Sequence, residues 1–480
     1  MGNKLTRRSF LQVSLAAGGS AVLAACGQAT PVATEAPPAE ATEAPVEATE
    51  APAEATAVPA TPVPATEAPQ PAKYTESPML AEKVAAGELP PIEERLPLEP
   101  KIVNALPPDW LTPEIGKHGG TLRLADGTVQ YSNDGYMMHC TPPLNTPGIQ
   151  GDNVTPNLFK SYESNDDYSE YTFTLREGMK WSDGVPVTTE DIRFVWEDLV
   201  LNEEYSPAGP SSRFRAGSKI RNNPMTLEII DDYTFKCTFD GPYGGFPVAL
   251  SIQGWVSYNE IMQPRHFLEQ FHPKYADPDE LAAAIAAENF ETWVQLMGFK
   301  AFNSWNYFRV QSLEVPKLTP WILVESSDQR CVTERNPYYW KVDAAGNQLP
   351  YFDRIEYTYV PDREVLAIQQ MAGDVDYACE PLVMPKLSLY RENEEVGKFR
   401  LMLGNIHRTS GCAFLHLTVP DEAWRKVVQN LDFRRALSHA IDRLEIIDAV
   451  YYGLGEPSHL NPNEYDPDLA NELLDGIGMD

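Results

Sequence analysis

The chain has 480 residues, of which 43% are hydrophobic, so it has enough apolar side chains to build two or three folded domains. Its formal net charge of −31 excludes a nucleic-acid-binding protein, because binding to phosphate requires a basic surface. An acidic surface mainly provides solubility, and it also favours cationic or neutral solutes.

The first 26 residues have the layout of a lipoprotein export signal. Basic residues, among them Arg7 and Arg8, precede an apolar stretch over 10–25 that is too short and too rich in small residues to span a bilayer. The string TRRSFL resembles a twin-arginine signal, and the string LAAC, which ends at Cys26, resembles a lipobox. We therefore expect export of the protein, cleavage before Cys26 and acylation of the Cys26 thiol.

Residues 27–117 are predicted to form a disordered tether rich in Pro, Ala, Thr and Glu. Between 27 and 72 there is no Lys, Arg or aromatic residue, and the unit TEAP recurs. Recurrent prolines prevent a helix, and such a composition cannot bury enough apolar area to become ordered. An extended coil over residues 27–72 reaches on the order of 140 Å. Beyond residue 72 the hydrophobic residues still show little periodicity through Pro108, so the folded body is expected to begin at about residue 118.

Alternation of apolar and polar residues predicts several strands in this body. The alternating sets are Leu122 and Leu124; Tyr171, Phe173 and Leu175; Phe235, Cys237 and Phe239; and Ile355, Tyr357 and Tyr359. The pattern predicts that the thiol of Cys237 is buried as a small hydrophobic group. The six cysteines contain no CxxC pair, so neither a zinc ribbon nor a redox motif is indicated, and the sequence assigns no disulfide.

A turn and a capped helix follow the second of these strands. The turn is predicted at Ser182-Asp183-Gly184, where the glycine permits a positive φ. Thr188 or Thr189 can cap the helix, with Asp191 in the position of the acid of a capping box. The apolar residues at helical spacing then predict a single buried face, made of Ile192, Val195, Trp196, Leu199 and Val200.

The run NVTPNLFKSYESNDDYSEYTFTLREGMKWSDGVPVTTEDIRFVWEDLV, which holds these elements, resembles the signature of the family 5 extracellular solute-binding proteins. These are the oligopeptide, dipeptide and nickel receptors of ABC importers. The positions that match the signature are Pro156, Leu158, Tyr171, Thr172, Phe173, Leu175, Arg176, Gly178, Lys180, Trp181, Ser182, Asp183, Gly184, Pro186, Thr188, Asp191, Phe194 and Trp196. The later blocks ERNPYYWKVDAAGNQLPYFDRIEYTYVPD, QQMAGDVDYA and DFRRALSHAIDRLEIIDAVYYGLGEP follow in the family's order.

The resemblance implies an α/β fold of the two-lobed periplasmic-binding-protein type (type II, with an extra inserted domain). Lobe one would comprise 118–126 and 236–378, the inserted domain 127–235, and lobe two 379–480. Within lobe two, Asp442 and Asp466 are predicted to cap helices, with Pro467 at the start of the second. The family continues beyond such a helix, so we expect the second lobe to be incomplete at residue 480.

Two segments are candidates for ligand binding. The loop after the first strand of lobe one is where the family places ligand contacts, and it offers Tyr131, Asn133, Asp134, Tyr136 and Met137. The alternative is an ordinary connection in which Tyr136 and Met137 are packed. The run GCAFLHL resembles an early strand of lobe two that borders the cleft, and it offers Cys412, Phe414 and His416. A plain core strand explains this second run equally well.

The remaining chemistry points to a binding protein. Histidines such as His139, His266 and His272 have no further ligands at metal-binding spacing, so we expect no metal and no cofactor. Nucleophile elbow, P-loop and dinucleotide motifs are missing from the sequence, so no catalytic residue is assigned and the protein is not expected to be an enzyme. Aromatic runs such as NSWNYF fit either a core or a surface that stacks on sugar rings.

The resemblance thus implies a monomeric substrate-binding lipoprotein on the outer face of the cytoplasmic membrane. It would capture oligopeptides or dipeptides and deliver them to an ABC permease with its cytoplasmic ATPase. Oligosaccharide binding within the same family is the main alternative. A surface adhesin and a secreted hydrolase are alternatives from other classes, and the sequence does not identify the ligand.

Overall fold

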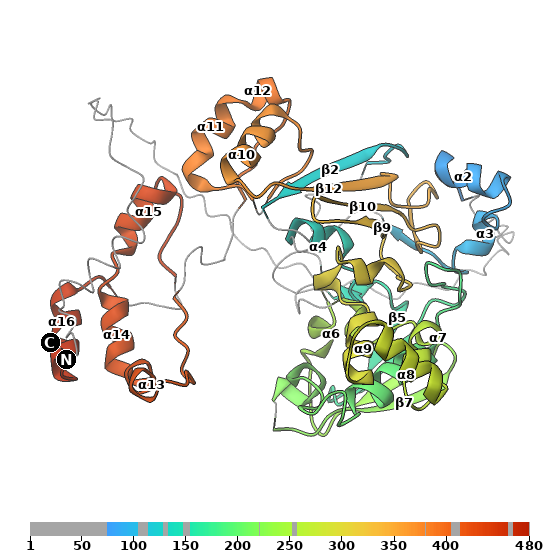
Figure 1. The fold of residues 1–480 in the computed structure, drawn as a ribbon, viewed down its shortest axis with the longest axis horizontal. Helices are drawn as coiled ribbons and strands as arrows, with labels where there is room; N and C mark the ends of the chain where they lie inside the picture. The colour runs from blue at the N-terminus through green and yellow to red at the C-terminus, as the bar shows by residue number, and fades with distance from the viewer. Residues whose placement is uncertain are drawn as a thin grey trace, which may run out of the picture. The chain divides into compact units, whose positions relative to one another are not determined.

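The computed structural model describes residues 74–103, 114–127, 133–146, 154–219, 221–251, 257–379, 381–404, 413–458 and 464–479. The described residues form two compact units, one within Pro69–Gly404 and one within Asn405–Asp480 (Figure 1). The predicted export signal with Arg7, Arg8 and Cys26, and the tether up to residue 73, lie outside the described residues. Within the described stretches no helix has both the length and the apolarity that crossing a bilayer requires.

The first unit contains all the strands that the structure describes. They are β1 (Lys101–Val103), β2 (Thr121–Asp126), β3 (Leu144–Asn145), β4 (Thr155–Pro156), β5 (Ser161–Ser164), β6 (Glu170–Thr174), β7 (Thr226–Asp231), β8 (Thr234–Thr238), β9 (Trp321–Ser326), β10 (Arg330–Arg335), β11 (Lys341–Asp343) and β12 (Arg354–Tyr359). Its helices of four or more residues are α2 (Pro78–Ala85), α3 (Ile92–Arg95), α4 (Asn133–His139), α5 (Thr189–Arg193), the π-helical η1 (Phe194–Val200), α6 (Phe246–Ala249), α7 (Arg265–Leu268), α8 (Pro278–Ala287), α9 (Trp293–Lys300), η8 (Val310–Leu313), α10 (Arg363–Ala372), α11 (Leu387–Glu392) and α12 (Glu394–Gly397).

An ordered arm, residues 74–103, forms the start of the first unit. The prediction of a disordered tether up to residue 117 is therefore wrong for these residues. The arm contains α2 and α3, and its strand β1 pairs in parallel with β11. The Arg95 side chain is fully buried and donates to the carbonyls of Pro90 and Pro337 and to Oε1 of Gln348. It also forms an ion pair with Glu76. The composition of the arm gives no sign of order, because its partners come from distant parts of the chain.

A mixed four-stranded sheet in the order β2-β12-β10-β9 forms one layer of this unit. β2 and β12 are parallel, whereas β10 is antiparallel to both of its neighbours. The predicted alternation holds, because Leu122, Leu124, Ile355 and Tyr357 are all buried. The pairing therefore brings the first strand of the body next to one that follows it by more than two hundred residues (Figure 1).

A second sheet, in the order β5-β6-β8-β7, is wholly antiparallel. Phe173 of β6 and Phe235 of β8 are Cα partners, fully buried, and their rings stack with centroids 5.2 Å apart. Cys237 of β8 is also fully buried, which confirms its predicted place in the core, and burial raises the pKa of its thiol. The described cysteines Cys140, Cys237, Cys331 and Cys379 are not disulfide-bonded.

The predicted turn and capped helix of the signature run are confirmed. Gly184 has a φ of 91°, and Thr188 and Asp191 form the capping box at the start of α5. The predicted apolar face is buried, with Val200 only partly so. One difference is that the helix continues from Phe194 as a π-helix, in which Leu201 N–H donates to the carbonyl of Trp196. Phe194 and Asp198 are buried as well, because α7, α8 and α9 cover a second face of this helix.

The crossover, residues 374–379 after α10, is held by hydrogen bonds along the free edge of β2. Arg123 of β2 binds the Asp376 carboxylate through its backbone N–H (2.7 Å), Nε (3.0 Å) and Nη2 (2.7 Å), and Asp376 N–H donates to the Arg123 carbonyl (2.9 Å). Nη2 also donates to the carbonyl of Gly373, which ends α10 with a φ of 79°. α11 and α12, which the resemblance placed in lobe two, belong to the first compact unit and contact α10.

The second unit is helical over the residues described. It contains α13 (Glu422–Gln429), α14 (Leu431–His439), α15 (Arg443–Tyr451) and α16 (Pro467–Gly476). The predicted caps are confirmed, since Asp442 accepts from Glu445 N–H and Asp466 accepts from Leu469 N–H. α14 contacts α16, and Val428, Phe433 and Ala470 are buried.

Candidate ligand-binding site

The carboxyl ends of the parallel strands β2 and β12 lie side by side. Asp126 and Tyr359 are Cα partners, and Val360 N–H continues the ladder to the Asp126 carbonyl at 2.8 Å. In open α/β sheets, ligands bind outside the carboxyl ends of strands. The first candidate loop leaves from this edge, so its position fits a binding site.

Helix α4 carries most of the candidate residues of this loop and is held on one side by aromatic rings. His139 is buried, its Nδ1 lies 2.8 Å from the Gly135 carbonyl, and its ring lies on Tyr307 with centroids 3.7 Å apart. Burial lowers the pKa of His139 to about 3, so the imidazole is neutral. A Cβ at Gly135 would overlap the ring of Phe308, which itself stacks on Tyr357 of β12. The helix is therefore packed against the sheet through its histidine and glycine.

Tyr136, Met137 and Trp305 form the aromatic and apolar part of the site. The rings of Tyr136 and Trp305 are parallel within 7°, with centroids 4.1 Å apart. Tyr136 is buried, Trp305 is half-buried, and Met137 is 54% exposed. Burial also raises the pKa of the Tyr136 hydroxyl, which keeps it protonated. The tyrosine thus supports the tryptophan from one side, while Met137 offers an open apolar contact.

Asp134 has a structural partner within the same unit. Its carboxylate is 7% exposed and accepts from the backbone N–H of Cys379 at 2.8 Å. This contact joins the start of α4 to the end of the crossover that Arg123 fastens to β2. Of the other two candidates here, Tyr131 lies outside the described residues, and Asn133 is the first residue of α4.

The second candidate segment does not form the predicted strand. The described residues 413–417 are not in a strand, Phe414 is 90% exposed, and His416 lies 3.0 Å from the Thr418 hydroxyl. A strand needs a neighbour for its backbone groups, and the described part of this unit is helical. Cys412 lies outside the described residues. This segment and α4 belong to separate compact units.

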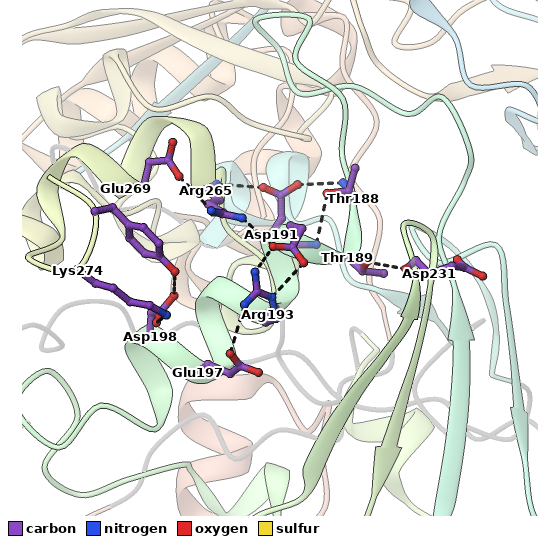
Figure 2. Close-up of polar contacts among 12 residues, drawn as sticks. Thr188, Thr189, Asp191, Arg193, Glu197, Asp198, Asp231, Arg265, Glu269 and Lys274 are labelled. Carbon is purple, nitrogen blue, oxygen red and sulfur yellow. Dashed lines mark hydrogen bonds and ion pairs between the residues drawn. The ribbon is translucent and has the colours of Figure 1, made fainter.

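The signature run forms a network of hydrogen bonds around Asp191, part of which is drawn in Figure 2. The Asp191 carboxylate is 4% exposed and accepts three hydrogen bonds. Two come from Thr188 N–H (3.1 Å) and Arg265 N–H (3.0 Å), as drawn in Figure 2, and the third comes from Trp181 Nε1 (3.2 Å). Burial raises the pKa of Asp191 to about 6. Trp181 is itself fully buried. The motif that carries the family resemblance therefore stabilises the fold.

Charged side chains surround this hydrogen-bond network. Glu190 pairs with both Arg193 and Arg265, and the buried Asp198 accepts from Lys274 Nζ (2.7 Å) and the Tyr275 hydroxyl (2.6 Å) (Figure 2). Proximity of Lys274 and Tyr275 holds the pKa of Asp198 below its ordinary value, against the opposing effect of burial. In the part of the chain that the structure describes, no group of three or more His, Cys, Asp or Glu side chains is arranged to hold a metal ion.

Sequence reasoning missed two contributors to the site. Trp305 comes from the run NSWNYF, whose aromatic content was noted but whose partner Tyr136 was not identifiable. The Arg123–Asp376 contact was also missed, because a charged pair so distant along the chain gives no local pattern. The family resemblance indicated the loop, but no local pattern indicated the distant residues that contact it.

Comparison with known proteins places these features in a family. The model of "Bacterial extracellular solute-binding proteins, family 5 Middle" matches residues 153–480. A periplasmic alpha-galactoside-binding protein of Rhizobium meliloti is 32% identical over 409 residues, covering 79% of this chain and 54% of the relative. The dipeptide-binding protein DppE of Bacillus subtilis is 23% identical and covers 65% of this chain and 49% of the relative. The chain spans about half the length of these relatives.

Two solved structures have a similar fold. An oligopeptide-binding protein OppA matches with a TM-score of 0.62 and 31% identity, over 85% of this chain and 64% of the other. The periplasmic binding protein MelB of Agrobacterium fabrum C58, solved with stachyose, matches with a TM-score of 0.60 and 23% identity, over 85% of this chain and 62% of the other. The α/β fold expected from the sequence is confirmed by these similarities.

Proposed function

Because the chain belongs to the bacterial extracellular solute-binding proteins of family 5, we propose that it is the extracytoplasmic receptor of an ABC importer. It captures oligopeptides or dipeptides and presents them to a membrane permease that a cytoplasmic ATPase drives. The observation that carries this proposal is the family match over residues 153–480, together with the apolar site at the carboxyl ends of β2 and β12.

Peptide binding draws on both the relatives and the site. Similar proteins named for oligopeptides and dipeptides support this ligand class. The exposed Met137 suits variable side chains, since its thioether adapts to different shapes. Capture proceeds by closure of two lobes, because a ligand shifts the protein toward the state that binds it better.

Oligosaccharides are the second candidate ligand. The 32% identical relative is named for alpha-galactosides. The half-buried ring of Trp305, supported by Tyr136, supplies an aromatic surface of the kind on which sugar rings stack. A peptide receptor and an oligosaccharide receptor would be stabilised by different compounds, so one screen with both libraries distinguishes them.

The test is a thermal unfolding screen of the whole chain against a peptide library and an oligosaccharide library. A true ligand stabilises by about 2.7 kcal/mol at a hundred times its Kd. We expect hits among peptides that Trp305→Ala weakens, with Tyr168→Ala as a control at an exposed tyrosine of the β5–β6 turn. Hits confined to sugars would move the assignment to the second ligand, and flat responses in both libraries would refute a transport receptor.

Anchoring and export complete the proposal. The protein leaves the cytoplasm through the twin-arginine route as a monomer, and a lipid on Cys26 holds it on the outer face of the cytoplasmic membrane. Mass spectrometry of the mature amino terminus should find a diacylglycerol thioether, and Cys26→Ser should release the protein into the medium. Replacement of Arg7 and Arg8 by Lys should stop export.

The protein binds without catalysis in this proposal. Chromogenic glycosides and peptides should remain intact after prolonged incubation with the pure chain. Turnover of any of them would instead indicate a secreted hydrolase. Tight binding to a protein partner without any small-molecule ligand would indicate an adhesin.

A further inference from the structure

Three basic side chains gather where the arm joins the body. Lys101 of β1 and Lys341 of β11 are Cα partners in the parallel pair that attaches the arm. Lys341 Nζ lies 4.9 Å from the centroid of the Trp340 ring, and Cζ of Arg176 lies 5.5 Å from the same centroid. One indole therefore has two of the cations beside it, and strand pairing brings the third next to them.

The polar partners of these cations are neutral backbone carbonyls. Lys101 donates to the carbonyl of Pro156, and Arg176 donates through Nε to the carbonyl of Asn157 (3.1 Å) and through Nη1 to that of Glu99 (3.0 Å). The Lys341 ammonium lies over the rings of Trp340 and Tyr339, and the Cys140 thiol also interacts with it electrostatically. An ammonium has three donors and a guanidinium five, so most donors of the cluster are left over.

Among the described residues no carboxylate forms an ion pair with Lys101, Arg176 or Lys341. The Glu99 carboxylate, which pairs with Lys160, attracts Arg176 from a greater distance. Arg176 is 7% exposed, and both lysines are half-buried. Buried charges in proteins are normally paired, because an unpaired charge loses its hydration without compensation. This cluster departs from that rule in a chain with a net charge of −31.

The cations also disfavour one another. Burial, with repulsion from Arg176, lowers the pKa of Lys101 to about 8. Burial lowers the pKa of Lys341 to about 7, and repulsion from Lys101 and Arg176 acts in the same direction. A bound anion would remove this penalty by supplying the missing negative charge and accepting the unused N–H groups.

We propose that Lys101, Arg176 and Lys341 form a binding site for a small oxyanion of the phosphate or sulfate type. The anion links β1 of the arm to β11 and to the signature run, which supplies Arg176. It thereby fastens the arm to the body. The claim does not depend on which solute the protein transports.

The experiment is equilibrium dialysis of the whole chain against radiolabelled inorganic phosphate, with thermal unfolding in phosphate and in chloride at matched ionic strength. We expect saturable binding, and a rise in Tm with phosphate that chloride does not produce. Lys341→Met keeps the apolar stem beside Trp340 and should weaken phosphate binding at least tenfold. It should also raise Tm in chloride, because repulsion within the cluster is relieved.

The matched control is Lys83→Met, a 40% exposed lysine that pairs with Glu334 and should leave phosphate binding unchanged. Lys160 is not a suitable control, because it neutralises Glu99 beside Arg176. If Lys341→Met does not fold, Lys101→Met provides the same loss of charge from the other strand. The proposal is overturned if binding does not saturate, if the Lys83 and Lys341 variants bind phosphate equally, or if sulfate and phosphate stabilise no better than chloride.

Discussion

Removal of the Asp191 carboxylate should destabilise the first unit far more than an ordinary surface change. Asp191→Ala deletes the acceptor of three N–H groups, those of Trp181 Nε1, Thr188 and Arg265. The Thr188 group lies at a helix start and can turn to water, so its loss costs about 1 kcal/mol. The other two donors lose a partner where water has little access, at about 1–3 kcal/mol each. We therefore expect a loss of about 3–7 kcal/mol, a large part of the stability of a typical domain.

Urea unfolding, followed by tryptophan fluorescence and circular dichroism, measures this loss. The fluorescence of Trp181 reports on the hydrogen-bond network around Asp191, because this side chain is fully buried and donates to Asp191. Glu163→Ala, at an exposed position of β5, is the control and should change stability by less than about 0.5 kcal/mol. A loss below about 1 kcal/mol for Asp191→Ala would show that the three donors find other partners, and the reasoning would be refuted.

Three further predictions concern single groups. Burial raises the native pKa of Asp191 to about 6, so the stability that the protonated carboxyl contributes is present below about pH 4 and is lost as the pH rises through 6. The free energy of unfolding should therefore fall by about 2 kcal/mol from pH 4 to 7, relative to Asp191→Asn. Burial lowers the pKa of Lys317 to about 7, so the native state releases a proton that the unfolded chain keeps; stability should rise from pH 7 to 10 in the wild type, and calorimetry should find this rise missing in Lys317→Met. Gly373→Ala should cost more than about 2 kcal/mol in urea unfolding, because φ is 79° and a Cβ would overlap the Gly397 carbonyl, whereas Gly298→Ala in α9 has open space and should stabilise by about 0.5–1 kcal/mol.

Local elements could be predicted from the sequence because their signals span only a few residues. The capping box of Thr188 and Asp191 and the caps at Asp442 and Asp466 each depend on contacts within one helical turn. The alternation around Phe173 fixed which side chains of β6 are buried. The family resemblance then placed these elements in a two-lobed fold, which the similar structures support.

The arm shows where this approach fails. Like the tether before it, the arm shows little hydrophobic periodicity, yet Arg95 binds Pro337, which lies 242 residues further along the chain. No pattern within residues 74–103 specifies such a partner. The same limit explains the unpredicted π-helix at Phe194, whose second buried face is required by α8 and α9.

The candidate site was found only in part for a related reason. The loop position followed from the resemblance, and Tyr136 and Met137 lie on α4, the first helix described after β2. Their roles differ, however, because Tyr136 is buried under Trp305 and Met137 is exposed. Phe414 was expected on a strand that the described residues do not form.

The fastening of Asp376 onto β2 has a consequence for behaviour at high concentration. β2 is the last strand of its sheet, and an unpaired outer strand is a template onto which a foreign chain can add. Here the peptide group of Arg123 already exchanges hydrogen bonds with Asp376 in both directions. A second molecule would have to displace the crossover before it could extend the sheet, so this border is closed to intermolecular growth.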